Sequence, residues 1–326
     1  MRWAILGLGN IAKKFAKTIN SLEDETLYAL GSRDINKALE FNKEFNALKC
    51  YGSYEELLKD DNIDIVYIST PNNMHYENAL MALNNNKNVL LEKPFTTNPY
   101  EAKELYALAK EKGLFIMEAL WIRFLPLYKK LKELLKSNII GNIKDISVSY
   151  GFDTNPERKK RKFDSKLAGG ALLDIGIYNI GLLDMLIDSD IESFESKYNI
   201  NEYNTDDYSE IYFKYKNGVN AKSIISIGKN IDREVFINGE KGLIYIPDFQ
   251  HATKFVLKID KKEEEYNFPF MINGFEYQIN EVIKSINNKL NESTIYGSND
   301  SIRLMTTLYD IRKSFNMLFE FEEEFK

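Results

Sequence analysis

The sequence predicts an α/β domain built on a parallel sheet, followed by an α+β domain with a large, open and mostly antiparallel sheet. In the first third of the chain, short apolar runs alternate with amphipathic segments of helical period, as expected for parallel strands joined by crossover helices. After about residue 120 longer strands follow one another, and the pairs Asn217-Gly218 and Asn238-Gly239 are typical of hairpin turns. A length of 326 residues and a hydrophobic fraction of 44% are sufficient for two domains of about 150 residues each.

The first domain is predicted to span residues 1–120. Its strands are expected at 2–6, 27–32, 63–69, 88–91 and 114–117. Its helices are expected between them, at 11–21, 36–45, 54–59, 76–85 and 99–112. The last helix has the clearest ends, because Asn98 can cap it, Pro99 occupies its first position and Gly113 terminates it.

The second domain is predicted to span residues 121–298. A helix at 127–137 and a strand at 143–152 lead into a charged loop, and a helix follows at about 170–187. The remaining strands are expected at 191–201, 209–215, 220–227, 234–237, 243–246, 254–259 and 264–268, and two last helices at about 274–288 and 299–319. The basic run 158–162 in the loop is predicted to be solvated, with contact to a phosphate or another anion as the alternative.

Composition and charge exclude several classes of function. A net charge of −6 and a pI of about 5.3 provide no basic field for nucleic acid. The single cysteine, Cys50, excludes an intrachain disulfide and fits a reducing compartment. Two histidines with one cysteine are too few for a nitrogen–sulfur zinc site, so no metal is expected. We find no signal-peptide core and no run of about 20 apolar residues, and therefore expect a cytoplasmic protein without membrane contact.

A glycine-rich turn links the first predicted strand to the first helix. In Gly7-x-Gly9-x-x-Ala12, Gly7 permits the tight turn, Gly9 lets a pyrophosphate approach the backbone, and Ala12 lets the helix pack closely on the strand. The free amides at the start of the helix also suit a diphosphate. Turns use glycine for conformational reasons alone, so the position within the strand–helix pattern is what indicates a dinucleotide site.

The end of the second predicted strand indicates the type of dinucleotide. A site that prefers NAD usually places an acid there for the ribose 2′-hydroxyl. Here Ser32 and Arg33 occupy this place, and their hydrogen-bond donors suit a 2′-phosphate. Asp34 follows, but it is also a natural N-cap for the next helix. The sequence therefore favours NADP over NAD, which stays possible; the alternative for Arg33 is a solvated side chain.

A lysine held by a proline ends the predicted strand 88–91. Placing the Lys93 ammonium at the end of a buried strand is costly unless its charge is used. A structural ion pair with Glu92 is one use. Pro94 fixes the local bend, however, as expected where a side chain must be aimed at a ligand. With the glycine turn, this suggests a nicotinamide cofactor beside a catalytic lysine.

Four motifs at corresponding places carry a family resemblance across nearly the whole chain. They are Gly7-Leu8-Gly9-Asn10-Ile11, Thr70-Pro71-Asn72-Asn73-Met74-His75, Glu92-Lys93-Pro94 and Gly141-Asn142-Ile143. Through them the chain resembles the glucose–fructose oxidoreductase/inositol dehydrogenase (Gfo/Idh/MocA) family. The resemblance implies an N-terminal Rossmann domain that binds the cofactor through the first three motifs, and it suggests that the Lys93–Pro94 peptide bond is cis.

Two further segments resemble one branch of that family. They are Met117-Glu118-Ala119-Leu120-Trp121-Ile122-Arg123-Phe124 and Gly169-Gly170-Ala171-Leu172-Leu173-Asp174-Ile175-Gly176-Ile177-Tyr178. The branch comprises the dimeric trans-1,2-dihydrobenzene-1,2-diol dehydrogenases and the NADP-dependent D-xylose 1-dehydrogenases. It implies a homodimer whose open sheets pack face to face, consistent with a strand such as 209–215 carrying apolar residues on both faces. It also implies that the final helix, 299–319, packs back on the Rossmann domain.

Asp174 and Tyr178 are predicted to share one face of a helix, since they lie at i and i+4. Many family members have histidine where Tyr178 stands, and this chain agrees with the dihydrodiol branch. A tyrosine pKa near 10 is too high for an efficient base at neutral pH, but a nearby ammonium lowers it. The resemblance implies that Lys93 is this ammonium. On spacing alone, Tyr178 could equally be a core aromatic.

Other residues are expected around these groups. Thr70, Pro71 and Asn72 follow a strand end and are expected to line the nicotinamide side. His75 is predicted to begin the next helix, with a role as general base as the alternative. The resemblance places Trp121 and Arg123 at the cofactor edge of the pocket, although Trp121 could be packing between domains. Phe152 and Phe163 are candidates for apolar walls of the substrate pocket.

The sequence thus predicts an NADP(H)-dependent dehydrogenase or reductase with Lys93, Asp174 and Tyr178 as its catalytic residues. It is expected to transfer a hydride between the nicotinamide and a hydroxyl/carbonyl of a sugar, polyol or cyclic dihydrodiol. Two alternatives share the fold. One is a non-catalytic NADP-binding sensor or regulatory subunit, and the other is a reductase of a conjugated imine or tetrapyrrole.

Overall fold

The computed structural model describes residues 1–325, which divide into two units. The first comprises Met1–Trp121 and Met271–Thr306, and the second comprises Ile122–Phe270 and the chain from Thr307 onward. The segment from Met271 lies in the first unit, where helix α9 (Phe275–Asn287) packs on α1 (Asn10–Asn20). Helix α10 (Ser298–Ser314) is divided between the units after Thr306.

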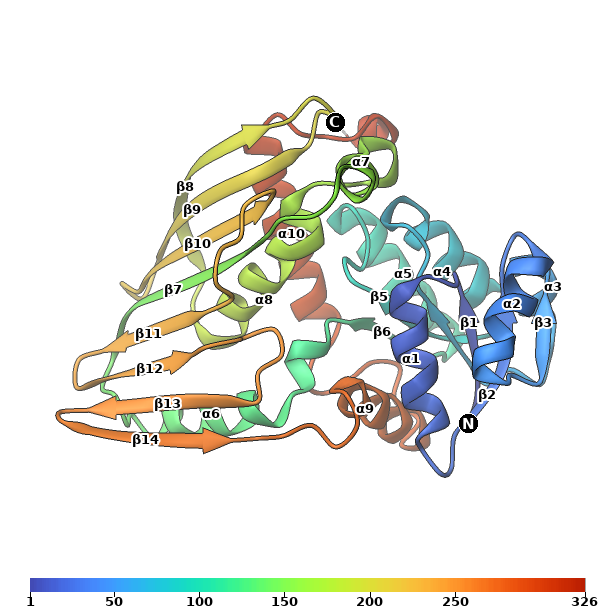
Figure 1. The fold of residues 1–326 in the computed structure, drawn as a ribbon, viewed down its shortest axis with the longest axis horizontal. Helices are drawn as coiled ribbons and strands as arrows, with labels where there is room; N and C mark the ends of the chain where they lie inside the picture. Colours follow the sequence, from blue (N-terminus) through green and yellow to red (C-terminus); the bar gives the residue numbers. More distant parts are fainter. Residues whose placement is uncertain (326) are drawn as a thin grey trace. The chain divides into compact units, whose positions relative to one another are not determined.

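The first unit contains a six-stranded sheet in the order β3-β2-β1-β4-β5-β6, and every ladder is parallel (Figure 1). The strands are β1 (Arg2–Leu6), β2 (Thr26–Gly31), β3 (Lys49–Tyr51), β4 (Ile65–Ile68), β5 (Asn88–Glu92) and β6 (Ile116–Ala119). The helices that follow β1, β2, β3, β4 and β5 are α1, α2 (Ile35–Phe45), α3 (Tyr54–Leu58), α4 (His75–Asn84) and α5 (Pro99–Lys112). This is the predicted parallel sheet. Only the short edge strand β3 was not predicted, because three residues carry no periodic signal.

The order of the strands locates the ligand side of this sheet. The chain runs outward from β1 to β3 and then returns to β4 on the other side of β1. Ligands bind beyond the carboxyl ends of the strands at such a switch point. Helix α1 is fixed there by Phe15, whose ring stacks on Tyr67 of β4 at 3.7 Å and meets the edge of Trp3 of β1 at 5.5 Å.

The second unit contains an eight-stranded sheet in the order β14-β13-β12-β11-β7-β10-β9-β8 (Figure 1). The strands are β7 (Ile143–Phe152), β8 (Ile191–Ile200), β9 (Asp206–Tyr215), β10 (Asn220–Ile227), β11 (Val235–Gly239), β12 (Gly242–Ile246), β13 (Lys254–Ile259) and β14 (Lys262–Asn267). All neighbours are antiparallel except β7 and β10. This confirms the prediction of a large, mostly antiparallel sheet.

Helix α8 (Ile177–Leu186) and the π-helical turn that leads directly into it, Leu172–Gly176, pack on this sheet. The other helices of this part of the chain are α6 (Pro126–Lys136) and α7 (Pro156–Phe163). Helix α8 packs on β7 and β10 (Figure 1). The segment Ser165–Leu186 is long and apolar enough to cross a membrane, but 83% of its most apolar window is buried within the structure, as is typical of a core helix.

One sequence prediction about this unit is wrong. Residues 156–163 form helix α7 rather than a loop, because Asn155 caps the Arg158 amide and Pro156 occupies the first turn.

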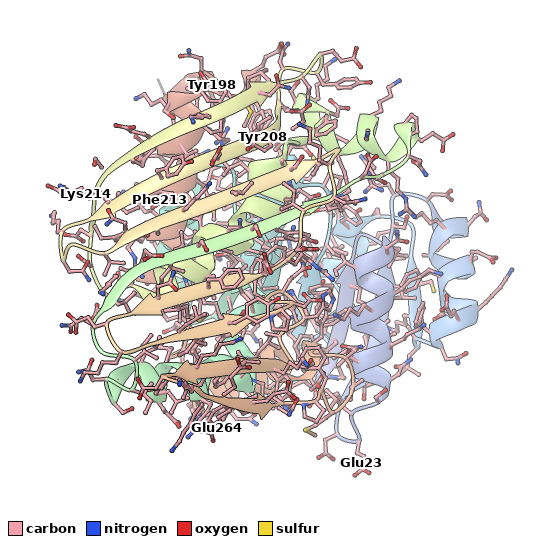
Figure 2. All side chains as sticks on the ribbon, turned by 60° about the vertical axis from the view of Figure 1, so that its left-hand side comes forward. Glu23, Tyr198, Tyr208, Phe213, Lys214 and Glu264 are labelled. Atoms are coloured by element: carbon pink, nitrogen blue, oxygen red, sulfur yellow. The ribbon has the colours of Figure 1, made fainter. Side chains whose placement is uncertain are left out.

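Strand β9 carries most of its apolar residues on one face. Ser209, Ile211, Phe213 and Tyr215 are buried on one face, while the other carries Tyr208, Glu210, Tyr212 and Lys214 (Figure 2).

Candidate active site

The glycine turn between β1 and α1 has the geometry of a phosphate-binding turn. Gly7 has a φ of +87°, and a Cβ there would lie 2.7 Å from the Ser69 carbonyl oxygen, so only glycine fits. Gly9 precedes α1, and its Cβ position would have no atom of the described chain within 4 Å. No side chain caps the helix start, which leaves its amides for a ligand. Ala12 is fully buried. These features fit a dinucleotide diphosphate on Gly7–Ile11.

The side chains that follow β2 have different roles, and Asp34 is the helix cap that the sequence predicted. The Asp34 carboxylate accepts a hydrogen bond from the Asn36 amide at 2.9 Å and so caps α2. The Ser32 hydroxyl oxygen accepts one from the Asp34 amide at 3.2 Å. Arg33 is exposed beside them. The acid at this strand end is therefore engaged as a helix cap, while the Arg33 guanidinium is exposed.

His75 joins two strand ends of the first unit. It is the first residue of α4, and its ring nitrogens lie 2.7 Å from the Pro94 carbonyl oxygen and 3.0 Å from that of Thr70. Burial lowers its pKa to about 4. Asn78 also donates to the Thr70 hydroxyl oxygen at 3.0 Å. Each ring nitrogen lies on a backbone carbonyl oxygen, and a neutral imidazole can donate to only one of the two. These contacts support the interpretation of His75 as the start of a helix that fixes the loop at Thr70.

The turn at Glu92-Lys93-Pro94 is held by two buried carboxylates. The Lys93–Pro94 peptide bond is cis, as the family resemblance suggested. On one side, Glu92 accepts a hydrogen bond from the Tyr67 hydroxyl at 2.5 Å, and burial raises the pKa of its carboxyl to about 7. On the other side, the Phe95 amide donates to Glu118 Oε1 at 3.0 Å.

Glu118 was not among the predicted site residues. It lies in β6 and is fully buried, and its Oε2 accepts hydrogen bonds from the Tyr296 and Ser301 hydroxyls at 2.7 and 2.6 Å. Glu118 could have been identified from the sequence, because it is a carboxylate within the apolar run of a buried strand. Glu118 thus ties the lysine turn to the return segment Met271–Thr306.

Trp121 packs within the first unit. Its ring meets the edge of Phe275 with the centroids 5.4 Å apart, and Lys14 Nζ lies 4.1 and 4.2 Å from the two ring centroids. Burial lowers the pKa of Lys14 to about 8. Arg123, by contrast, lies in the second unit, where its guanidinium pairs with Asp184 of α8 at 2.5 Å. The two predicted neighbours therefore belong to different units.

The second unit carries Asp174 and Tyr178 where the π-helical turn meets α8. Asp174 lies in the turn and Tyr178 is the second residue of α8, so the expected i, i+4 spacing crosses a widened helical turn. Asp174 is paired with Lys162 of α7. Lys162 Nζ also lies 5.1 Å from the ring centroid of Phe152. Lys162, from the run 158–162 predicted to be solvated, thus belongs to the site.

The buried ring of Tyr178 lies near a second group of side chains. The centroid of the Tyr150 ring is 6.5 Å from that of Tyr178, and the Arg233 guanidinium lies 5.5 Å above Tyr150. Arg233 also donates to Asp248 at 2.8 Å and to Gln250 at 3.0 Å. Phe163 is buried and stacks on Tyr203 with centroids 6.4 Å apart.

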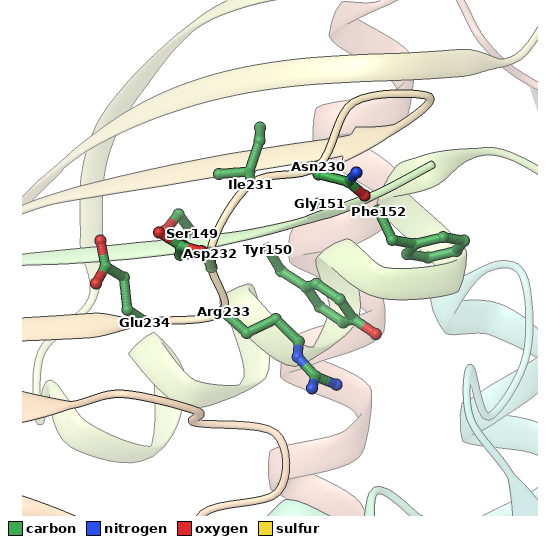
Figure 3. Close-up of a pocket in the computed structure, with 9 residues that line it drawn as sticks. All are labelled: Ser149, Tyr150, Gly151, Phe152, Asn230, Ile231, Asp232, Arg233 and Glu234. Carbon is green, nitrogen blue, oxygen red and sulfur yellow. Dashed lines mark hydrogen bonds between the residues drawn. The ribbon is translucent and has the colours of Figure 1, made fainter. Parts of the chain in front are cut away.

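A surface cavity of about 710 Å³ borders this group (Figure 3). Its lining residues are Ser149, Tyr150, Gly151, Phe152, Asn230, Ile231, Asp232, Arg233 and Glu234. Tyr150, Phe152 and Arg233 point to one side of β7, whereas Ser149 and Glu234 point to the other (Figure 3). The sequence did not predict Arg233 as a site residue, because the segment 228–233 has no periodic or motif signal. Tyr150 lies in the predicted strand 143–152, where no motif singled it out.

Comparison with known families decides the classification. Residues 1–120 match the model of the oxidoreductase family with an NAD-binding Rossmann fold, and residues 128–245 match the model of the GFO/IDH/MocA C-terminal domain. The chain belongs to the GFO/IDH/MocA family of oxidoreductases. This confirms the family predicted from the motifs.

Individual relatives agree with this classification. The chain is 34% identical to trans-1,2-dihydrobenzene-1,2-diol dehydrogenase of Mus musculus over 98% of both chains. It is 31% identical to the Xenopus laevis enzyme of the same name, over 98% of this chain and 99% of that enzyme. In fold it is similar to a 3-ketoreductase from Actinomadura kijaniata solved with NADP and TDP-benzene, with a TM-score of 0.88 at 23% identity over 96% of this chain and 97% of that one.

Proposed function

We propose that this protein is an NADP(H)-dependent dehydrogenase that transfers a hydride between the nicotinamide and a hydroxyl/carbonyl of a sugar, polyol or cyclic dihydrodiol. One observation carries the proposal: three features occur together in a chain of this family. They are an open phosphate turn at Gly7–Ile11, a lysine turn held by buried carboxylates, and Asp174 with Tyr178 on one helical turn. The named relatives are trans-1,2-dihydrobenzene-1,2-diol dehydrogenases, and the similar solved structure is a 3-ketoreductase with NADP bound.

In this proposal the residues have separate tasks. Bound NADP supplies or accepts the hydride at its nicotinamide. Tyr178 takes the proton of the substrate hydroxyl during oxidation and returns it during reduction, and Lys93 stabilises the phenolate. Asp174, whose charge is balanced by Lys162, orients the substrate hydroxyl or the tyrosine. Phe152, Phe163, Tyr150 and Arg233 are proposed to line the substrate pocket, and Thr70, Pro71, Asn72, His75, Glu92 and Trp121 the cofactor side.

The cation–anion pairing of the second unit favours an uncharged substrate. Lys162 is paired with Asp174, and Arg233 is paired with Asp248. Both of these cations are thus balanced by a carboxylate, which lowers their attraction for a free anion. Paired carboxylates and guanidinium N–H groups still accept and donate hydrogen bonds to hydroxyl groups. We therefore propose neutral polyols over sugar acids or sugar phosphates.

A turnover assay with both cofactors tests this function and its alternatives. Reduction of NADP by at least one neutral sugar, polyol or trans-diol is the expected result. Tight NADP binding without turnover of any panel member, in either direction, would instead identify a sensor or regulatory subunit. Turnover restricted to conjugated imines or tetrapyrroles would identify the other reductase class.

Replacement of Arg33 by alanine should weaken NADP binding by about 10- to 100-fold, the scale of a lost charged hydrogen bond. NAD binding should change little, because NAD has no 2′-phosphate. Fluorescence titration with both reduced cofactors measures the two affinities. Lys37→Ala, one turn into α2 and also exposed, is the matched control and should leave both unchanged. Equal losses for the two cofactors on Arg33→Ala would refute the assignment.

We also propose a homodimer formed through the uncovered face of the eight-stranded sheet, in the cytoplasm. Supporting this, the face carries aromatic side chains that no helix covers in the described chain, including Tyr212 at 39% exposure and the stacked pair Phe236 and Tyr245. Sedimentation at micromolar concentration should give twice the chain mass of 37.9 kDa. Tyr212→Glu should shift the equilibrium toward the monomer, whereas Tyr100→Glu, an exposed tyrosine of the first unit, should not. A monomeric parent chain would refute the proposal.

A further inference from the structure

A buried carboxylate from strand β9 caps the helical turn that carries Asp174. Asp206 is fully buried, and its Oδ2 accepts a hydrogen bond from the Leu172 amide at 2.8 Å. Leu172 is the first residue of the π-helical turn, and no local side chain caps this helix start. Amides at a helix start lack intrahelical partners. The cap is therefore supplied from a strand 34 residues away in sequence.

The second oxygen of Asp206 occupies the space that Gly170 leaves open. A Cβ on Gly170, whose φ is +117°, would lie 2.5 Å from Asp206 Oδ1. This oxygen has no hydrogen-bond partner among the described residues. The Gly170 amide donates to the Lys162 carbonyl oxygen at 2.8 Å. The glycine turn is thus fitted between the end of α7 and the buried carboxylate.

The residue before Asp206 fixes the partner of Asp174. The Thr205 hydroxyl donates to the Phe163 carbonyl oxygen at 2.9 Å, directly after Lys162. Lys162 forms the ion pair with Asp174. Two adjacent residues at the start of β9 therefore hold both segments that bring Asp174 and Lys162 together.

The C-terminal segment covers this junction. The Asp206 amide lies 3.1 Å from Met317 Sδ, and the Met317 carbonyl oxygen accepts from Arg312 at 3.3 Å. Arg312 and Glu322 form a fully buried pair, in which Nη1 and Nη2 of the guanidinium each lie within 2.8 Å of a carboxylate oxygen. Water is thereby kept from Asp206, whose only side-chain hydrogen bond in the described chain is the one to Leu172.

We infer that Asp206 is a positioning residue for the proposed reaction: its buried carboxylate sets the turn that carries Asp174 and Tyr178. An asparagine could accept the same hydrogen bond without the cost of burying a charge. The acid gives a stronger, charge-assisted bond and suits the positive end of the helix. The inference rests on the proposed function, because the turn is catalytic only if that function holds.

The ionisation of Asp206 distinguishes positioning from simple structural support. Burial raises the pKa of its carboxyl to about 7. The groups that face it are the amide of Leu172, the Gly170 turn, Asp207 beside it, Arg312 of α10 and Met317. Because the folded pKa is raised, the stabilising effect of the protonated form is present at low pH and is lost as pH rises through about 7.

The test compares Asp206→Asn and Asp206→Ala with the parent chain. Above pH 7, Asp206→Asn should have a Tm equal to or higher than the parent, yet a kcat lower by about tenfold, because a charged hydrogen bond is about twice as strong as a neutral one. Asp206→Ala should lower kcat by about 100-fold, as expected for a misplaced reacting group. NADP affinity should stay unchanged in both, since the glycine turn lies in the other unit. Asp207→Asn, a half-exposed neighbour bonded to Asn199 at 2.8 Å, is the control and should retain full kcat.

Amide hydrogen exchange gives a readout that does not depend on activity. The Leu172–Asp174 amides should exchange at least about tenfold faster in Asp206→Ala and not in Asp207→Asn. Unchanged exchange, or a parent-like kcat in Asp206→Asn and Asp206→Ala, would overturn the inference. The inference would also be overturned if Asp206→Asn lowered both kcat and the Tm at pH 8, because that result is expected of a structural residue. If the parent chain itself shows no turnover while Leu172 exchange responds as expected, the proposed function fails instead.

Discussion

Replacement of Tyr178 by phenylalanine is expected to lower kcat by at least about 100-fold, because positioned proton transfer contributes roughly 10²- to 10⁴-fold. Phenylalanine keeps the buried ring, which lies 6.5 Å from Tyr150, and removes only the hydroxyl. The affinity for NADP should stay within about twofold, since the loss concerns the transition state and not cofactor binding. Steady-state kinetics and a fluorescence titration with NADPH measure the two quantities.

Tyr215→Phe is the matched control for this change. Tyr215 is also buried in the second unit, but it is the last residue of β9. It therefore lies at the opposite end of the strand from Asp206, the first residue. Its replacement removes a hydroxyl without touching Asp174 and should leave kcat unchanged. If Tyr178→Phe keeps most of the activity, another group moves the proton. Asp174 then becomes the first alternative, because both ring nitrogens of His75 lie on backbone carbonyls.

Replacement of Lys93 by methionine is expected to lower kcat by a similar factor and to move the pH dependence of the residual activity upward. Methionine keeps the length and the apolar stem but removes the ammonium that stabilises a phenolate. The loss in the Tyr178→Phe and Lys93→Met double variant should be far smaller than the product of the single losses, because the two residues act as one unit. A pH–rate series on all three variants tests this.

Lys87→Met separates this effect from a loss of stability. Lys87 precedes the same strand, β5, at its opposite end, and its ammonium donates to the Asp60 carbonyl oxygen at 2.7 Å. This variant should lower the Tm without moving the pH profile. A Lys93→Met variant whose pH profile coincides with that of the parent chain would exclude Lys93 from setting the ionisation of Tyr178.

Local sequence signals predicted the features that depend on neighbouring residues. The turn at Gly7 was predictable because the pattern Gly7-x-Gly9-x-x-Ala12 lies between a strand and a helix. Strands β10 and β13 have the predicted bounds. Helix α5 likewise begins and ends at its predicted residues, with Asn98 as cap and Gly113 in the left-handed conformation.

Other features were not predicted, for different reasons. Helix α7 was missed because a run of cations suggests solvent, although Asn155 and Pro156 supply a local helix start. The π-helical turn at Leu172–Gly176 leaves no mark on the apolar pattern. The carboxylates of Glu118 and Asp206 act on residues 23 and 34 positions away, respectively, so only the folded chain brings them together.

The pH dependence of single-turnover hydride transfer in the parent chain and in Tyr178→Phe is the most direct test of the central claim. With saturating NADP and an alcohol substrate, the parent rate should rise with pH to a plateau as the general base ionises. In Tyr178→Phe the rate should be at least about 100-fold lower and should show no such plateau. The same rise and plateau in both proteins would contradict the account, because the ionising base would then be a group other than Tyr178.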